Sequence, residues 1–397
     1  MKHLTFLLIL LGLPLFQEEK QEFITPVFEY RSWFSRLKYD DFKPSEEYVQ
    51  DVDFTPVMHL SKKWKLFPLL EYRYRESSFR PEEFGDRFRN EYQFFRIAPT
   101  LRYYFNKDKN AGIGIFQAQE YSIESANEGW SSGLYDYIQR GIKLDFNSYG
   151  ISDFKAGLLF IRTEYPNFSG ERQIFEGEPD SVIDSDSYFF YVEYLKRTKS
   201  FFWKNKLSII YKNFHDQKVD RTLLGLQQAT NTGRNDLSYR YDGDFYKIIS
   251  RKYKLIGGLK YSILYRNSNQ NFYDTNGTAQ TSDDVYTEDF YDRRKYSISP
   301  YLNWYLTQKV TLKLSYTFAR NSYDNRKAQY TNATYKASNF WDSEQTVTLD
   351  IRYQHRKYLS FFISLFNEIG KSNNNYNAFS TEQYRVNGGI AGFSLNF

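Results

Sequence analysis

Apolar and polar residues alternate along most of the chain, beginning near Ile24. In segment 310–318 the even-numbered positions are Val, Leu, Leu, Tyr and Phe, whereas the odd-numbered positions are Thr, Lys, Ser and Thr. Segments 65–75 and 345–354 show the same alternation. Successive side chains of a β-strand point to opposite faces, so this pattern predicts strands with one apolar and one polar face.

The pattern predicts sixteen strands, joined by connections that alternate between very short turns and long polar loops. The strands are 25–39, 50–60, 65–75, 88–105, 111–119, 134–146, 153–163, 188–195, 201–214, 237–249, 253–266, 296–306, 309–319, 345–354, 358–369 and 384–397. The long loops are 40–49, 76–87, 120–133, 164–187, 215–236, 267–295, 320–344 and 370–383. Every short turn therefore falls at one end of the sheet, an order that a β-sandwich or propeller has no reason to keep. We expect an all-β, transmembrane, antiparallel up-and-down β-barrel with short periplasmic turns and long external loops.

Four prolines conflict with this prediction, because proline removes a hydrogen-bond donor from a strand ladder. Pro56, Pro68, Pro99 and Pro300 all fall inside predicted strands, toward their turn ends. We expect relaxed pairing or a bulge at these positions. If the prolines instead mark loops, the count falls to about fourteen strands.

A closed barrel suits a bilayer, because hydrocarbon offers no water to pair backbone N–H and C=O groups and closure removes the unpaired edges of the sheet. Aromatic residues gather at the predicted turn end, which is typical of an interfacial girdle. They are Trp64, Phe67, Tyr103, Phe105, Phe146, Trp203, Tyr253, Trp304 and Tyr358. Charge also separates by end, since the turns carry an excess of Lys and Arg and the loops an excess of Asp and Glu.

Composition narrows the class further. The 397 residues are 20% aromatic and 25% charged, contain no Cys and carry a formal net charge of +5. The lack of Cys excludes disulfides and thiolate metal sites. No apolar run reaches the ~18 residues of a membrane helix, which excludes a helical membrane protein. Lys and Arg alternate with acids and form no basic groove, so we expect no nucleic-acid partner.

The N-terminus has the pattern of a secretory signal peptide. Lys2 and His3 form a basic start, and the mostly apolar run Leu4–Phe16 follows. A helix of that length spans only ~20 Å, which is short of the ~30 Å hydrocarbon core. The sequence therefore predicts a cleaved signal over residues 1–20 and a single transmembrane β-barrel domain over residues 21–397.

The chain ends on its last predicted strand. In this strand Gly392 is followed by apolar residues at Leu395 and Phe397. With the signal peptide and the order of connections, this ending resembles the Gram-negative outer-membrane β-barrel class, in which a final strand with a terminal aromatic is read by the barrel-insertion machinery. Ile390 departs from the class pattern, because a polar residue is usual there. The resemblance implies a porin-like barrel in the bacterial outer membrane, with outer-membrane lipids and the insertion machinery as partners, and it indicates no single family.

The polar face of the strands is expected to point into the barrel. A charged side chain facing lipid at mid-membrane costs roughly 2–4 kcal/mol, so the many charges on this face imply a wet lumen. Sixteen strands enclose a bore wide enough for an aqueous channel. The candidate pore-lining residues are Lys65, Glu71, Arg73, Arg75, Arg102, Lys212, Lys260, Lys313, Asp350 and Arg352. The alternative is that these charges pair with one another and plug the lumen.

The sequence shows no convincing enzymatic constellation, and we expect no catalytic residues, no metal and no cofactor. Only His215, beside Asp216 at the start of a long loop, lies where a barrel hydrolase would need a histidine. Acidic stretches in loops 164–187 and 267–295 offer oxygen ligands for Ca²⁺. A solvated acidic loop is the simpler interpretation of both stretches.

Three functional classes compete. We favour a porin-like channel for passive diffusion of small polar solutes or ions. The alternative is a surface-interaction or assembly barrel, such as an adhesin, receptor or export partner, that works through its long external loops. A barrel-embedded hydrolase ranks third. The sequence leaves the solute and homo-oligomer formation undecided.

Overall fold

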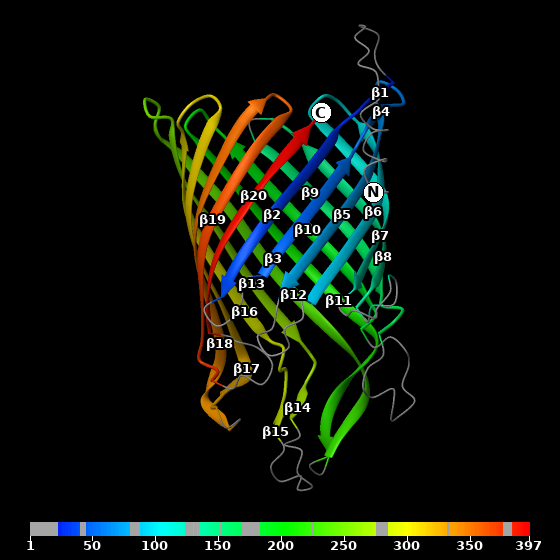
Figure 1. Ribbon diagram of the computed structural model, residues 1–397. Helices are drawn as coiled ribbons and strands as arrows, with labels where there is room; N and C mark the ends of the chain where they lie inside the picture. Colours follow the sequence, from blue (N-terminus) through cyan, green and yellow to red (C-terminus); the bar gives the residue numbers. More distant parts are fainter. Residues whose placement is uncertain are drawn as a thin grey trace.

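The computed structural model is a closed barrel of sixteen antiparallel strands (Figure 1). It describes residues 23–39, 45–79, 88–123, 130, 133, 135–150, 152–168, 183–223, 226–274, 285–331, 334–375 and 383–397. The predicted signal segment 1–20 lies outside these residues, so it stays a prediction, as does the single-domain boundary at residue 21. Within the described residues, no helix is long and apolar enough to cross a membrane.

Twenty β-segments make up the fold. They are β1 Ile24–Thr25, β2 Phe28–Tyr39, β3 Ser45–Phe54, β4 Val57–His59, β5 Trp64–Phe79, β6 Phe88–Tyr104, β7 Lys109–Ile123, β8 Tyr137–Ser148, β9 Ser152–Glu164, β10 Ser185–Arg197, β11 Phe201–Leu223, β12 Leu226–Ser250, β13 Leu255–Ser268, β14 Phe272–Asp274, β15 Val285–Thr287, β16 Arg293–Tyr305, β17 Val310–Gln329, β18 Tyr335–Arg356, β19 Leu359–Ser372 and β20 Tyr384–Asn396. β1 continues into β2 and β3 into β4, whereas β14 and β15 form a separate ribbon. The predicted count of sixteen wall strands is therefore confirmed.

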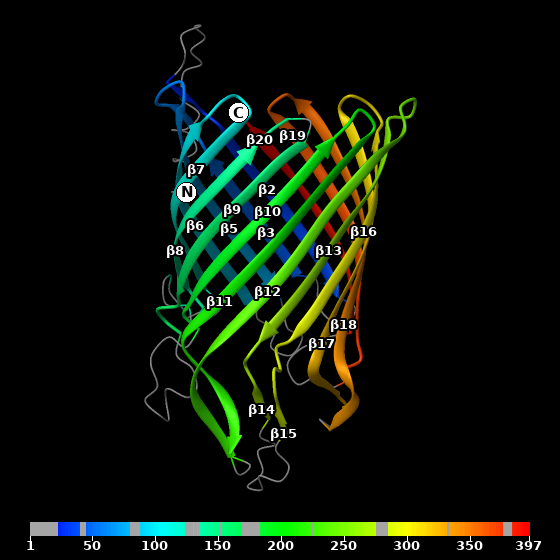
Figure 2. The ribbon, with the colours of Figure 1, turned by 180° about the vertical axis from the view of Figure 1, so that it is seen from behind.

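Short turns and long connections lie at opposite ends of the barrel, as the sequence predicts. The short turns and the C-terminus lie at the top of Figure 1, and the ribbon β14–β15 lies at the bottom. The view from behind shows the same separation (Figure 2). One expectation is wrong: segments 215–236 and 320–344 are largely not loops, because β11–β12 and β17–β18 continue far past the other strands. Both ladders shift register where they leave the wall, which marks the bulges that bend the hairpins away.

The four conflicting prolines interrupt the ladder without shifting its register. Three of them, Pro56, Pro68 and Pro99, form one row across neighbouring strands with a further proline, Pro26, and Pro68 pairs directly with Pro99. The ladder also skips Pro300 on the β17 side. By the same register Pro56 lies opposite Pro68. Neither residue has an N–H group, so no backbone hydrogen bond joins the two strands at this position. Relaxed pairing, rather than a bulge, accommodates the prolines.

The barrel closes between the first and last wall strands, because β20 pairs with both β2 and β19. Gly392 lies at this seam, where a Cβ atom would come within 2.6 Å of the Cβ of Trp33. Leu395 lies in the same ladders. The ring of Phe397 stacks on Tyr358 with 5.3 Å between ring centroids. Gly392 and Phe397 thus make close packing contacts here, and the role of the three residues as an insertion signal stays a prediction.

Candidate functional site

A hollow of about 570 Å³ identifies the inner face of the wall. Its lining comes from seven successive strands, β5 to β11, so it can lie only on the concave side of the sheet. Four basic residues contribute to it: Arg96, Arg102, Lys143 and Lys206. Aromatic and small residues complete the lining, including Phe67, Phe116, Tyr191 and Gly114.

All ten predicted pore-lining residues lie on this inner face, opposite exposed apolar neighbours such as Leu70, Tyr211, Leu314 and Leu349. Pairing relates them across strands. Lys65 opposes Arg102, Arg73 opposes Asp51, and Lys313 opposes Asp350. Whether solutes pass these residues is not a matter of geometry alone, so their role as pore lining belongs to the function proposed below.

Most of these charges are shared rather than free. Glu71 accepts a hydrogen bond from Arg96 at 3.1 Å, and Arg73 lies 3.3 Å from Asp51. Arg75 pairs with Glu47, Lys313 lies 3.6 Å from Asp350, and Arg352 donates to Ser360 at 3.0 Å. Three lysine ammonium groups instead lie over aromatic rings: Lys65 over Tyr104 at 5.0 Å, Lys212 over Phe214 at 4.4 Å and Lys260 over Tyr301 at 5.9 Å from the ring centroid. Pairing of charges, which the sequence left as an alternative, is thus extensive along the wall.

The best-satisfied group centres on Asp145 of β8, whose side chain is only 2% exposed. Arg102 donates to it at 2.8 Å, Lys143 lies 3.4 Å away, and Asn147 donates at 2.8 Å. Gly112 leaves the room that this network needs, because a Cβ there would lie 3.1 Å from the Asp145 carboxylate. One buried carboxylate therefore holds two cations in place on the inner face.

Further along the same wall, basic residues exceed the carboxylates that they share. Lys155 and Lys204 both contact Glu193, at 3.4 and 2.9 Å. Lys206 makes no ion pair with any described residue; its ammonium lies 5.0 Å from the ring centre of Tyr191. The sequence analysis passed over Arg96, Lys204 and Tyr191 as lining residues, although each shares the inward parity of the residues it selected.

The two halves of the inner face carry charge of opposite sign. On β5–β11 cations outnumber carboxylates: Lys65, Arg73, Arg75, Arg96, Arg102, Lys143, Lys155, Lys204, Lys206 and Lys212 against Glu71, Glu120, Asp145, Asp153 and Glu193. On β12–β20, β2 and β3 the balance reverses only slightly. The carboxylates Glu29, Glu47, Asp51, Asp53, Asp236, Asp242, Asp244, Asp342, Glu344, Asp350 and Glu368 stand against the cations Arg31, Arg234, Arg240, Lys260, Arg266, Arg293, Lys295, Lys313 and Arg352. The halves meet where Lys206 of β11 opposes Asp242 of β12.

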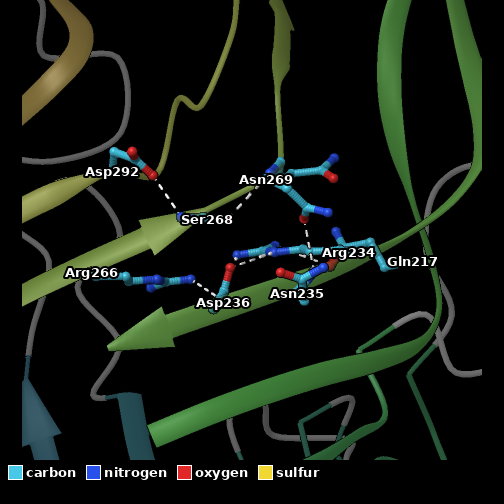
Figure 3. Close-up of polar contacts among 9 residues, drawn as sticks. Gln217, Arg234, Asn235, Asp236, Arg266, Ser268, Asn269 and Asp292 are labelled. Carbon is cyan, nitrogen blue, oxygen red and sulfur yellow. Dashed lines mark hydrogen bonds and ion pairs between the residues drawn. The ribbon is translucent and has the colours of Figure 1, made fainter. Parts of the chain in front are cut away.

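A second polar cluster closes the loop end of the wall at β11–β13 (Figure 3). Arg234 is 8% exposed, donates to Asp236 at 3.3 Å, and stacks between the rings of Phe214 and Tyr291 at 4.5 and 4.6 Å. Arg266 also pairs with Asp236. These contacts tie the extended β11–β12 hairpin to β13.

Asp292 anchors the same cluster from the turn before β16. It accepts the backbone N–H of Ser268 at 2.6 Å. Burial raises the pKa of the Asp292 carboxyl, the Ser268 N–H opposes this shift, and the nearby carboxylates of Asp289 and Asp324 add to it. At a given pH, a larger fraction of Asp292 is therefore protonated than of an ordinary surface aspartate.

His215, the one histidine placed where a barrel hydrolase would need it, contacts Asp186 rather than the adjacent Asp216. Its Nε2 lies 3.2 Å from Asp186 of β10, whose carboxylate also receives two hydrogen bonds from Arg162 at 2.9 and 3.0 Å. Among the described residues no serine or threonine hydroxyl bonds to His215, and no group of three or more histidine or acidic residues is placed to hold a metal. Most of the two acidic stretches proposed for Ca²⁺ lies outside the described residues.

A closed wall with an apolar outer face and a charged inner face matches lipid outside and water inside. The chain is a closed, antiparallel, up-and-down β-barrel of the transmembrane type. No protein-family model matches it, and no curated protein matches it in sequence.

Solved structures align with this barrel at TM-scores below 0.5. A trimer form of OmpT from Vibrio cholerae gives a TM-score of 0.48 at 10% identity, over 94% of this chain and 99% of that chain. OccK8 (OprE) of Pseudomonas aeruginosa gives 0.46 at 9% identity, over 94% and 98%. OccK2 (OpdF) of the same organism, solved in complex with glucuronate, gives 0.45 at 9% identity, over 94% and 98%. Likenesses this distant bear on neither solute nor mechanism.

Proposed function

We propose that this barrel is a porin-like channel for passive diffusion of small polar solutes or ions. The observation that carries the proposal is the inner face, which is charged along its length, strongly basic on one half and slightly acidic on the other. Lys206 faces Glu193 and Asp242 across the ladder but makes no ion pair with either or with any other described residue, so a passing anion or polar solute would find its ammonium available. The ten pore-lining candidates and the additional residues Arg96, Lys204 and Tyr191 are the groups assigned to this role.

Opposed basic and acidic walls set up a field across the pore. Such a field orients dipolar solutes and tunes ion selectivity without any moving part. Passage is passive, because polar wall groups replace part of the hydration of the solute while the bore sets the size limit. The paired charges on the wall act here as fixed dipoles, and Lys206 adds a net charge at the boundary between the halves.

Planar-bilayer recording of the purified full chain tests the proposal. We expect steady open-channel steps, and we expect Lys206→Glu to shift the reversal potential in a salt gradient toward cation selectivity. Lys199→Glu, in the exposed turn of the same β10–β11 hairpin, is the matched control and should leave the reversal potential near that of the parent. Absence of conductance from folded protein, or equal shifts from both variants, would contradict the channel.

The extended hairpins favour a second candidate function. β11–β12 and β17–β18 project beyond the barrel at the loop end, and the latter is well packed, with Ala328 and Phe340 0% and 3% exposed. A surface-interaction or assembly barrel would use these rigid projections to bind a partner. Silent bilayers, together with loss of binding to whole cells or matrix after trimming either hairpin, would select this candidate. The hydrolase is not proposed, because no serine or threonine hydroxyl bonds to His215 among the described residues and the carboxylate beside it, Asp186, is already engaged by Arg162.

The remaining partners are expectations of the same proposal. Outer-membrane lipids would surround the apolar face, and the insertion machinery would read Gly392, Leu395 and Phe397. Small polar solutes would be the cargo, and a homo-oligomer is compatible with this assignment. We expect Phe397→Ser to lower the yield of heat-modifiable, folded protein in cells while leaving refolding in detergent intact. Equal losses in both assays would make Phe397 a packing residue only.

A further inference from the structure

The outer face of β6–β9 contains an apolar trough of about 710 Å³. Its floor is formed by three isoleucines, Ile97, Ile115 and Ile142, which are 57%, 60% and 51% exposed. Aromatic pairs rise on both flanks: Phe95 with Tyr72 at 4.9 Å between ring centroids, and Phe160 with Tyr188 at 5.3 Å. The volume lies in the range of specific small-molecule pockets, and the apolar floor fits an acyl chain.

Arginines close this trough on the side toward the loops. Arg140 of β8 and Arg162 of β9 are directly opposed in the ladder, and Gln117 of β7 extends the same row. Like charges directly opposed across a sheet repel, so this pair requires negative charge nearby. Glu164 binds Arg140 at 2.9 Å, and Asp186 binds Arg162.

Those carboxylates do not use all the donors. Toward the described residues, Arg140 donates through one Nη, and Arg162 engages Asp186 through Nε and one Nη. Each guanidinium therefore keeps N–H groups directed at the outer surface, where both side chains are about half exposed. Planar, bidentate donors of this kind are suited to phosphate oxygens.

The height of the row places these donors within reach of a lipid headgroup. Arg140 lies three residues from the loop-side end of β8, and Arg162 two residues from the loop-side end of β9. Three residues span ~10 Å of strand, which at a tilt near 45° is ~7 Å along the membrane normal, and long arginine side chains extend from such a depth toward the interface. The arginines therefore enter the lipid-facing band from the loop side, above a floor that matches the acyl region.

We propose that this trough is a binding site for a phosphate-bearing lipid of the leaflet on the loop side. The acyl chain lies on the three isoleucines between the aromatic flanks, and the phosphate bridges Arg140 and Arg162 with Gln117 as a further donor. This site does not depend on conduction through the lumen.

Native mass spectrometry of the detergent-purified full chain tests the site. The probes are phosphatidic acid and diacylglycerol with identical acyl chains. We expect one phosphatidic acid to be retained per barrel and diacylglycerol to bind at least about tenfold more weakly. Arg140→Gln/Arg162→Gln should lower phosphatidic acid binding about tenfold, and Ile115→Trp should lower it by filling the trough without altering charge. Inorganic phosphate should not displace the lipid, because the acyl chain supplies part of the binding.

Arg294→Gln is the matched control. Arg294 is also an outward, loop-end arginine paired with one carboxylate, Asp324 at 3.2 Å, but it lies outside the trough. Its substitution should leave lipid retention unchanged, and all variants should keep heat-modifiable migration as a check on folding. Equal retention of the two lipids, an equal loss in Arg294→Gln, or displacement by inorganic phosphate would each overturn the proposal.

Discussion

The inner and outer faces of β6–β9 are built from the same four strands and have opposite chemistry. Inside, Arg102 and Lys143 both form ion pairs with Asp145, whereas outside, Ile115 and Ile142 are more than half exposed. Side chains of successive residues point to opposite faces of the wall, so that one faces lipid and the next faces the aqueous or polar interior. The face to which a side chain points, more than its position along the strand, therefore determines how much a substitution in this wall changes the free energy of unfolding.

The largest expected effect comes from adding the same charge to adjacent positions. Leu158 faces outward and is 55% exposed, whereas Leu159 lines the inner hollow. Leu158→Lys should lower the free energy of unfolding by about 2–4 kcal/mol, because it places an ammonium in lipid. Leu159→Lys should change it by less than about 1 kcal/mol, since the inner face already solvates cations. Urea unfolding in lipid vesicles measures the free energy of unfolding of both variants. Similar losses would mean that the inner face accommodates a charge no better than the lipid-facing surface does.

The inner face also depends on the sharing of charge. Asp145→Asn removes the carboxylate that holds both Arg102 and Lys143, and we expect it to lower the free energy of unfolding by about 1–3 kcal/mol. It should also increase anion selectivity in bilayer recordings, because two cations then lack a counter-charge. Asp153→Asn, on the same wall, is the control: its closest basic partner, Arg197, is 4.0 Å away, so the expected loss is below about 0.5 kcal/mol. Equal losses at the two sites would show that the Asp145 network carries no special stability.

The fold was accessible from the sequence because two physical signals repeat along it. Period-two alternation marked each strand, and the strict order of turns and loops marked closure, so all sixteen wall strands were identified. The ends of four strands were not. Segments such as 320–344 are rich in Tyr, Asn and Asp, which indicates a loop, yet β17 and β18 extend through them because pairing with a neighbouring strand satisfies their backbone. Tertiary pairing overrides the local preference of such residues.

The sequence predicted which face of the wall the candidate residues occupy, but not which partners they contact. Parity placed Lys65, Arg73 and Lys313 on the inner face, but it could not show which carboxylate each one contacts. Arg73, for example, pairs with Asp51 on β3, and nothing in either segment reveals that register. The predicted strand 253–266 also begins too early, because Lys254 lies in the β12–β13 turn with a φ of 50°. A strand end moved by two residues is enough to remove a side chain from the lumen.

The smallest expected effect tests how tightly the inner face is packed. The ring of Tyr191 lies across Gly157, so that a Cβ there would come 2.4 Å from the ring Cε1. Gly157→Ala should lower the free energy of unfolding by about 1 kcal/mol or less, because only the outer part of the ring has to move. That movement also displaces the aromatic face beneath Lys206, so a small change in the reversal potential should accompany it. Ala156→Val, the adjacent outward substitution, meets lipid rather than a ring and should leave both stability and selectivity unchanged. If Ala156→Val cost as much as Gly157→Ala, packing would be equally strict on both faces, and the contrast between the two sides of the wall would be one of charge alone.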